Sequence, residues 1–159
     1  MANLSSGSTC STPKPETQGK DGWYIDLNVE GTGEQAVTSS IIFGGLVFFS
    51  TNRPVATPPG ACADNLGRAR GYALNLLNAS GAADTLNICG GTRSSVFVGG
   101  GLPPSPVTGT VPVNGKEVTV MIGGATRGGG TSCAICGNKV TPSITQRRQR
   151  MYWYTDTDK

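Results

Sequence analysis

The sequence predicts an all-β protein built from antiparallel sheets joined by long loops rich in glycine and proline. Short β-branched and apolar runs recur between turn-forming residues, and the 159 residues include 24 Gly and 10 Pro. No stretch of about 11 residues or more shows the 3.6-residue apolar period of an amphipathic helix. We therefore expect about one domain with a modest core and no long helix.

The first predicted strand runs from Trp23 to Val29, after an irregular lead-in over residues 1–20. Apolar and polar residues alternate in this stretch, which places Trp23, Ile25 and Leu27 on one face of the strand.

A hairpin is predicted around Gly44-Gly45, because glycine tolerates the positive φ that a two-residue hairpin loop requires. Its strands are Ala36–Ile42 and Leu46–Ser50. The second strand is apolar on both faces, so we expect it to be central in its sheet.

The strongest hairpin signal of the chain is Asn114-Gly115, which separates two β-branched runs. Two long loops are also expected, Asn52–Arg68 with its three prolines and Gly123–Val140 with its many glycines. The other predicted strands are Gly71–Leu77, Leu86–Cys89, Ser94–Val98, a strand starting at Pro106, the hairpin strands Thr110–Val113 and Lys116–Ile122, and Ser143–Tyr154.

The complete lack of histidine excludes a Ser-His-Asp triad and imidazole metal ligands. Five cysteines lie in loops, where disulfides of an exported protein are the favoured interpretation and a four-thiolate zinc site or free thiols are the alternatives. An odd number leaves one cysteine over. The disulfide candidates are Cys10, Cys62, Cys89, Cys133 and Cys136.

No apolar run approaches the roughly 20 residues of a membrane-spanning helix, so no membrane span is expected. The first residues carry neither a basic nor an apolar signal region, so no signal peptide is expected within this numbering, and an exported protein would carry its signal upstream.

Two segments repeat the order of small-residue strand, glycine-bearing turn and apolar strand, with their turns about 70 residues apart. They are Val37–Phe49 and Pro104–Ile122. After the first, Arg70-Gly-Tyr-Ala-Leu-Asn-Leu76 and a Ser-Gly turn supply a third strand. This order is typical of a blade of a quinoprotein-like β-propeller.

The segment that begins Gly22-Trp-Tyr-Ile-Asp-Leu27 resembles the C-terminal β-propeller region of PilY-type proteins of type IV pili. The resemblance covers about 55 residues, and its later motifs are Gly33–Ile42, Gly44-Gly45 with Val47–Thr51, Pro54, Cys62 and Arg70–Leu74. It is looser at Pro106-Val107 and at Arg147–Tyr154.

The resemblance implies a noncatalytic module in type IV pilus biogenesis, pilus-tip adhesion and twitching motility. It also implies an exported protein of the Gram-negative cell envelope, at the outer-membrane surface or pilus tip. The implied partners are the remaining blades of a longer chain, minor pilins or the pilus tip, and a host surface ligand. No cofactor is expected in this chain, and the calcium loop of the family belongs to a different blade.

Length limits how much of a propeller this chain can form. A blade takes about 40 to 50 residues and a closed ring at least four blades, so 159 residues supply two to three. We expect a partial propeller over residues 21–159, with blade-like units at about 22–98 and 103–154.

No catalytic, cofactor or metal residue is predicted. Asp156, Asp158 and the Asp64-Asn65 pair supply too few oxygens for calcium. Cys133 and Cys136 lack the helical context of a redox pair, so they are expected to close a small loop or to pair with Cys89 or Cys62. Since Cys10 and Cys62 flank the segment with the resemblance, a bridge between these two is the first choice.

Arginines next to aromatic residues near the C-terminus have two interpretations. Such a mixture occurs in single-stranded nucleic-acid sites, but the period of two also suits a terminal strand, and we expect no nucleic acid. The group is Arg147, Arg148, Arg150, Tyr152, Trp153 and Tyr154.

Two alternative functions remain at this point. One is a fragment of a quinoprotein-like dehydrogenase, disfavoured because a quinone site needs the axis of a whole ring. The other is a stand-alone secreted β domain that binds a surface.

Overall fold

The computed structural model describes residues 1–3, 19–29, 31–61, 65–83, 91–98, 100–123 and 138–140, and these residues contain strands and turns but no helix. They form a two-stranded, a three-stranded and a five-stranded sheet. The predicted all-β class is confirmed. The strands are β1 (Ala2–Asn3), β2 (Trp23–Tyr24), β3 (Gln35–Ala36), β4 (Ile41–Phe43), β5 (Leu46–Arg53), β6 (Arg68–Asn75), β7 (Ser94–Val96), β8 (Val107–Val113), β9 (Lys116–Ile122) and β10 (Asn138–Lys139).

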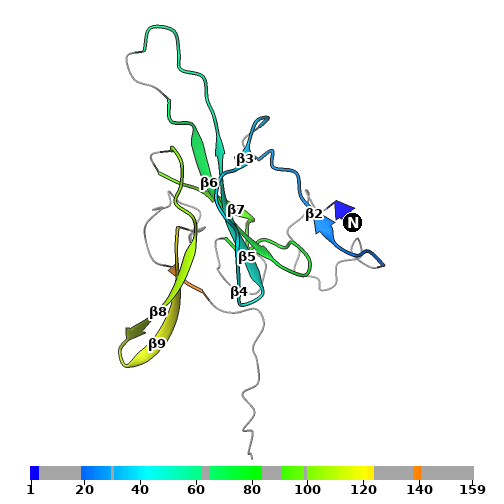
Figure 1. Cartoon of the computed structure of the whole chain (residues 1–159), viewed down its shortest axis with the longest axis vertical. Helices are drawn as coiled ribbons and strands as arrows, with labels where there is room; N and C mark the ends of the chain where they lie inside the picture. The colour runs from blue at the N-terminus through cyan, green and yellow to red at the C-terminus, as the bar shows by residue number, and fades with distance from the viewer. Residues whose placement is uncertain are drawn as a thin grey trace, which may run out of the picture.

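The five-stranded sheet is an antiparallel meander (Figure 1). β5 pairs with β6 along its whole length, and β6 pairs with β7. β3 and β4 lie one after the other along the opposite edge of β5. The prediction that Leu46–Ser50 is central in its sheet is therefore confirmed.

Both predicted two-residue hairpins are confirmed. Gly44 and Gly45 have φ angles of 59° and 81°, and Asn114 and Gly115 have φ angles of 51° and 74°. Positive φ at both central residues is the geometry of the type I′ turn, whose twist matches that of the flanking strands.

The loop predicted over Asn52–Arg68 is too long at both ends, because β5 continues to Arg53 and β6 begins at Arg68. The polar residues at this end of β5 are buried and hydrogen-bonded. Ser50 Oγ donates to the carbonyl of Gly123 at 3.2 Å, and Asn52 Nδ2 donates to the carbonyl oxygens of Leu66 and Gly101. A buried polar group is tolerated when it has such a partner.

The strand predicted over Gly71–Leu77 ends two residues early, at Asn75. The side-chain oxygen of Asn75 accepts a hydrogen bond from the backbone N–H of Leu77 at 2.9 Å, which starts a turn. The strand predicted over Ser94–Val98 is likewise shorter and ends at Val96.

Two other predicted strands are only partly formed. Of the predicted strand Trp23–Val29, only β2 is paired. Its partner is β1, which runs parallel to it and lies within residues 1–20, where an irregular lead-in was expected. Ala36–Ile42 is interrupted, so that its two ends form β3 and β4.

One predicted loop contains a strand. β10 lies within Gly123–Val140 and pairs with β9, where it forms the third strand of the smaller sheet. The predicted strands Leu86–Cys89 and Ser143–Tyr154 lie outside the described residues.

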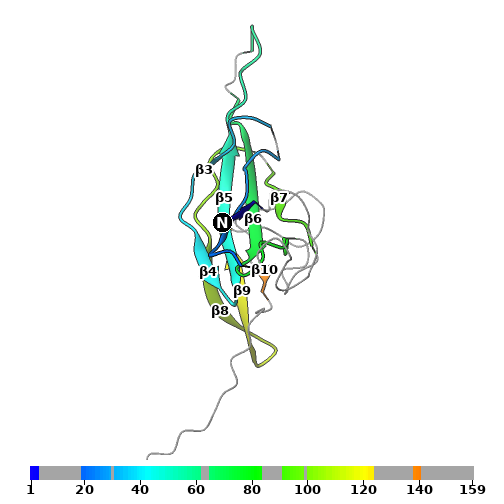
Figure 2. The same ribbon diagram turned by 90° about the vertical axis from the view of Figure 1, so that its right-hand side faces the viewer.

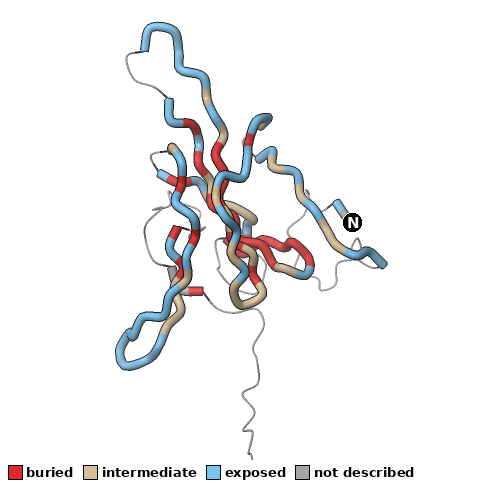
Figure 3. Tube along the Cα trace, in the orientation of Figure 1, coloured by how far each residue is buried: buried red, intermediate tan, exposed pale blue. Residues whose placement is uncertain are grey.

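The five-stranded and three-stranded sheets share one core. Leu46, Phe48 and Ala73 project from β5 and β6 toward Met121 of β9, and Val140 follows β10 into the same cluster. Figure 3 shows the buried positions gathered along β5, β6 and the segment after β6. In Figure 2 the β5–β6 loop projects from one end of this body and the β8–β9 turn lies toward the other.

Candidate functional site

An open apolar groove lies on the face of the five-stranded sheet that points away from the shared core. Its volume is about 370 Å³. The nine residues that line it are all uncharged: Trp23, Ile25, Leu27, Ala36, Thr38, Ser40, Val47, Phe49 and Leu74.

Strand alternation places the floor of the groove. Val47 and Phe49 point to one face of β5, whereas Leu46 and Phe48 point to the other face and are fully buried in the core. Leu74 pairs directly with Val47, so it joins them on the groove side.

β2 and the residues that follow it form one wall. Trp23, Ile25 and Leu27 are partly buried, whereas the intervening Tyr24 and Asp26 are exposed, as the predicted alternation requires. The indole Nε1 of Trp23 donates a hydrogen bond to the carbonyl of Leu76 at 2.8 Å. Trp23 and Ile25 also pack on the buried Ala79. These contacts attach the wall to the end of β6.

The interruption between β3 and β4 forms the opposite wall. Ala36 pairs with Thr51 and Ile41 pairs with Phe48, so residues 37–40 lie opposite only residues 49 and 50. The backbone N–H of Ser50 donates to Thr38 Oγ1 at 2.8 Å, in place of a backbone acceptor. The extra residues bulge out of the strand, and two of them, Thr38 and Ser40, line the groove.

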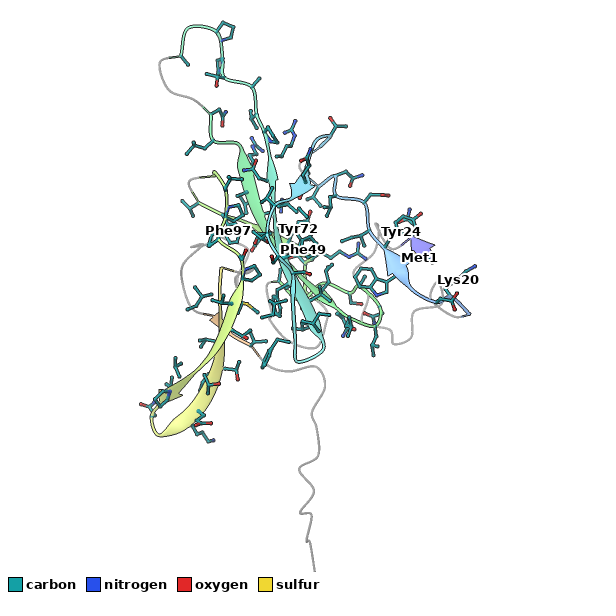
Figure 4. The ribbon with its side chains drawn as sticks, viewed as in Figure 1. Met1, Lys20, Tyr24, Phe49, Tyr72 and Phe97 are labelled. Carbon is teal, nitrogen blue, oxygen red and sulfur yellow. The ribbon has the colours of Figure 1, made fainter. Side chains whose placement is uncertain are left out.

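A buried carboxylate lies next to the groove on the same sheet. Glu34 Oε1 accepts hydrogen bonds from Thr51 Oγ1 at 2.7 Å and from the Tyr72 hydroxyl at 2.6 Å. The Tyr72 ring stacks on Phe49 with a centroid distance of 4.9 Å and an interplanar angle of 5° (Figure 4). Phe49 therefore connects the apolar groove with this polar cluster.

Burial is the main cause of a raised pKa at the Tyr72 hydroxyl, and the hydrogen bond to Glu34 and the charge of Glu34 raise the pKa further. Tyr72 stays protonated at neutral pH and acts as a hydrogen-bond donor to Glu34. The cluster holds the residues before β3 against β5 and β6.

A second open apolar surface lies on the outer side of the three-stranded sheet. The register sets Val107 opposite Ile122 and Val111 opposite Val118, so these side chains share one face, while Met121 points inward to the core. Four of its residues are at least 39% exposed. We call this surface the valine face; its residues are Val107, Val111, Val113, Val118, Val120 and Ile122.

The chemistry of both surfaces is that of binding. None of the groove-lining residues is titratable, so the groove is suited to apolar groups and offers no acid, base or nucleophilic thiol. Over the described ranges, no three metal-ligating side chains come together. The same ranges contain no helical segment with the length and apolarity of a membrane span.

Nearly all site residues singled out from the sequence lie outside the described residues. All five cysteines, the Asp156 and Asp158 carboxylates and the arginine-aromatic group at 147–154 lie outside the described residues. Of the Asp64-Asn65 pair only Asn65 is described, and it is exposed.

Neither the groove nor the Glu34 cluster was predicted from the sequence. The alternation of Trp23, Ile25 and Leu27 was a usable signal for one wall. Nothing local marked Glu34 as a buried acceptor.

The chain matches no protein-family model, no curated protein and no solved structure in the three comparisons made. The function of the chain therefore has to be inferred from its own residues and geometry.

Proposed function

We propose that the chain is a noncatalytic assembly module of a PilY-like protein, acting in type IV pilus biogenesis, pilus-tip adhesion and twitching motility. One observation carries this proposal. β3 and β4 together form one edge of an antiparallel meander, and β5, β6 and β7 follow in chain order, which gives four rows. The meander packs through its core face on a second sheet.

That arrangement is what a propeller blade and its neighbour require. Blades are four-stranded antiparallel sheets that pack through their faces around an axis. The meander lies within the proposed unit 22–98, and the β8–β9 hairpin lies within the proposed unit 103–154. The sequence resemblance to the PilY propeller region supports the same interpretation.

The outward faces add support. The groove and the valine face leave apolar surface at both outer sides of the two-sheet stack. An apolar sheet face open to water typically marks an interaction site. In the proposed protein, further blades of a longer chain, minor pilins or a ligand at the pilus tip would cover these faces, in the Gram-negative cell envelope.

Deletion of residues 22–159 from the full-length protein tests the proposal in a piliated strain. We expect fewer surface pili in sheared fractions, smaller twitching zones and weaker adhesion, all restored by the wild-type gene. Unchanged pili, motility and adhesion in the deletion strain would contradict the proposal.

A milder variant separates folding from assembly in the same strain. Replacing Val111 by Asp and Val118 by Lys charges the valine face, while replacing Thr110 by Asp and Thr119 by Lys puts the same charges on the opposite face of the same hairpin. We expect the first pair to reduce piliation and the second pair to leave it near wild type.

A further inference from the structure

β8 is an open edge of the three-stranded sheet. The strand order of this sheet is β10-β9-β8, so among the strands of the described residues β8 has a partner on one side only. The β8–β9 hairpin projects from the body, as Figures 1 and 2 show. Val107, Gly109, Thr110 and Val111 of β8 are exposed. A strand edge of this kind can pair with a further strand.

The backbone groups of Thr108 and Thr110 point toward this open edge. In an antiparallel ladder, hydrogen-bonded and non-hydrogen-bonded pairs alternate, and the backbone groups of a non-hydrogen-bonded pair point away from the partner strand. The carbonyl of Thr119 accepts from the N–H of Val140 at 3.1 Å, on the side of β9 that carries β10. The pair of Thr110 with Thr119 is therefore non-hydrogen-bonded, and so is the pair of Thr108 with Met121, two residues along.

The sequence of this edge reads the same in both directions. Pro106-Val-Thr-Gly-Thr-Val-Pro112 is a palindrome centred on Gly109. Two antiparallel copies related by a two-fold axis at Gly109 therefore set apolar against apolar and hydroxyl against hydroxyl residues, and such cross-strand pairs stabilise a sheet. The pairs between the copies are Val107 with Val111, Thr108 with Thr110, and Gly109 with Gly109.

The two prolines select this register and end it. Pro112 lies two residues beyond Thr110 in β8, and Pro106 lies two residues before Thr108. A slip by two residues in either direction would set a threonine opposite a proline, which has no N–H to donate. Only the register centred on Gly109 pairs every outward N–H of Thr108 and Thr110 with a carbonyl.

We propose that β8 pairs with β8 of a second copy, antiparallel and about a two-fold axis at Gly109. The two three-stranded sheets then join into one continuous sheet. The contact is isologous, so it closes at a dimer. It occupies a strand edge and leaves the groove and the valine face open to other partners, and it does not depend on the pilus function proposed above.

Gly109→Cys in the whole chain tests the position of the axis. The two Cα atoms at the centre of this register lie about 4.5 Å apart, a separation that suits a disulfide. A Cβ at Gly109 meets open space within one copy. Val113→Cys is the matched control, because this residue is also exposed and lies on the same face of β8, whereas its two copies would be at opposite ends of the paired strands.

Trypsin cleaves after Arg93 and Lys116 and releases residues 94–116, which contain no native cysteine. After mild oxidation we expect a disulfide-linked pair of this peptide from Gly109→Cys, and only the unlinked peptide from Val113→Cys. Mass spectrometry of the digests, with free thiols blocked, distinguishes the two. Equal linkage in both variants, or none in either, would overturn the proposal.

A second pair of variants tests the backbone donor. Thr110→Pro removes an N–H that points to the open edge, as Pro112 already does in the same strand, so the β8–β9 ladder keeps its bonds. Thr110→Val keeps the N–H and removes only the hydroxyl. Light scattering after size-exclusion chromatography should show a concentration-dependent dimer for the wild type and Thr110→Val. Thr110→Pro should dimerise at least about tenfold more weakly, which is about 1.4 kcal/mol.

Circular dichroism confirms that each variant is folded before it is compared. A wild type that stays monomeric at every concentration would overturn the proposal and leave this edge to a strand of a different protein. A Thr110→Pro protein that dimerises like the wild type, or assemblies larger than a dimer, would also overturn it. None of these outcomes bears on piliation by the full-length protein, so the two proposals fail separately.

Discussion

The five-stranded and the three-stranded sheets differ in which side of their strands carries the apolar residues. In the five-stranded sheet, the apolar residues Leu46 and Phe48 face the core, and polar residues of the same strand are buried with hydrogen-bond partners. In the three-stranded sheet, Met121 alone among the β8 and β9 residues belongs to the core cluster, and the valines point outward. Alternation thus identifies two faces of a strand, but contacts with other elements decide which face is inside.

The largest expected effect is the difference in unfolding free energy between substituting a buried and an outward-facing apolar residue. Phe48→Ala removes a fully buried ring from the core between the sheets, and we expect a loss of about 4 kcal/mol in the free energy of unfolding. Val111→Ala, on the valine face, should cost less than about 1 kcal/mol because its side chain is 39% exposed. Urea unfolding followed by circular dichroism measures both. Equal losses would mean that the valine face is packed as tightly as the core.

The next effect concerns the buried carboxylate of the five-stranded sheet. Glu34→Ala leaves the hydroxyls of Thr51 and Tyr72 without their acceptor, and we expect a loss of about 3 kcal/mol. Glu34→Gln keeps an acceptor oxygen and should lose clearly less. The exposed neighbour Gln35 is the control, and Gln35→Ala should change the unfolding free energy by less than about 0.5 kcal/mol. A Glu34→Ala protein as stable as this control would show that the cluster is not stabilising.

Tyr72→Phe removes a donor to Glu34 and should cost about 1 kcal/mol at neutral pH. It should also change the alkaline limb of the stability curve. The pKa of Tyr72 is raised in the folded protein, so the unfolded chain loses its proton first, at its usual pKa near 10.

Stability from this residue is therefore complete below about pH 10 and falls as the pH rises further, by at most about 1.4 kcal/mol per pH unit. Thermal melts between neutral and alkaline pH should show a shallower decline in Tyr72→Phe than in the wild type. A decline of equal steepness in both proteins would argue against this role for Tyr72. Tyr24→Phe serves as the control, because this ring is exposed.

The smallest effect probes the outward face of the three-stranded sheet. Gly109 lies in β8 with open space around a built Cβ and an ordinary φ, so Gly109→Ala should stabilise the protein by about 0.5 kcal/mol. Gly115 has equally open space but a φ of 74°, and Gly115→Ala should cost about 1 kcal/mol. Thermal unfolding of the two variants compares them directly. A destabilised Gly109→Ala would show that this face is already covered.

Much of the fold was accessible from local chemistry. The two hairpins were predicted correctly because Gly44-Gly45 and Asn114-Gly115 satisfy a backbone requirement that few other residue pairs meet. The central strand followed from its apolar residues on both faces. The end of β5 was misjudged because Thr51 and Asn52 look like loop residues until their distant partners are known.

The class of the fold, the position of its tight turns and the alternation of its strands follow from the amino-acid sequence, since these depend on neighbouring residues. The buried face of each strand, the position of the groove and the partners of Glu34 depend on tertiary contacts. The physical reason is distance along the chain: Glu34 meets Tyr72 across 38 residues, and Ser50 meets Gly123 across 73. No local pattern encodes such a contact, because it exists only after distant segments of the chain have come together.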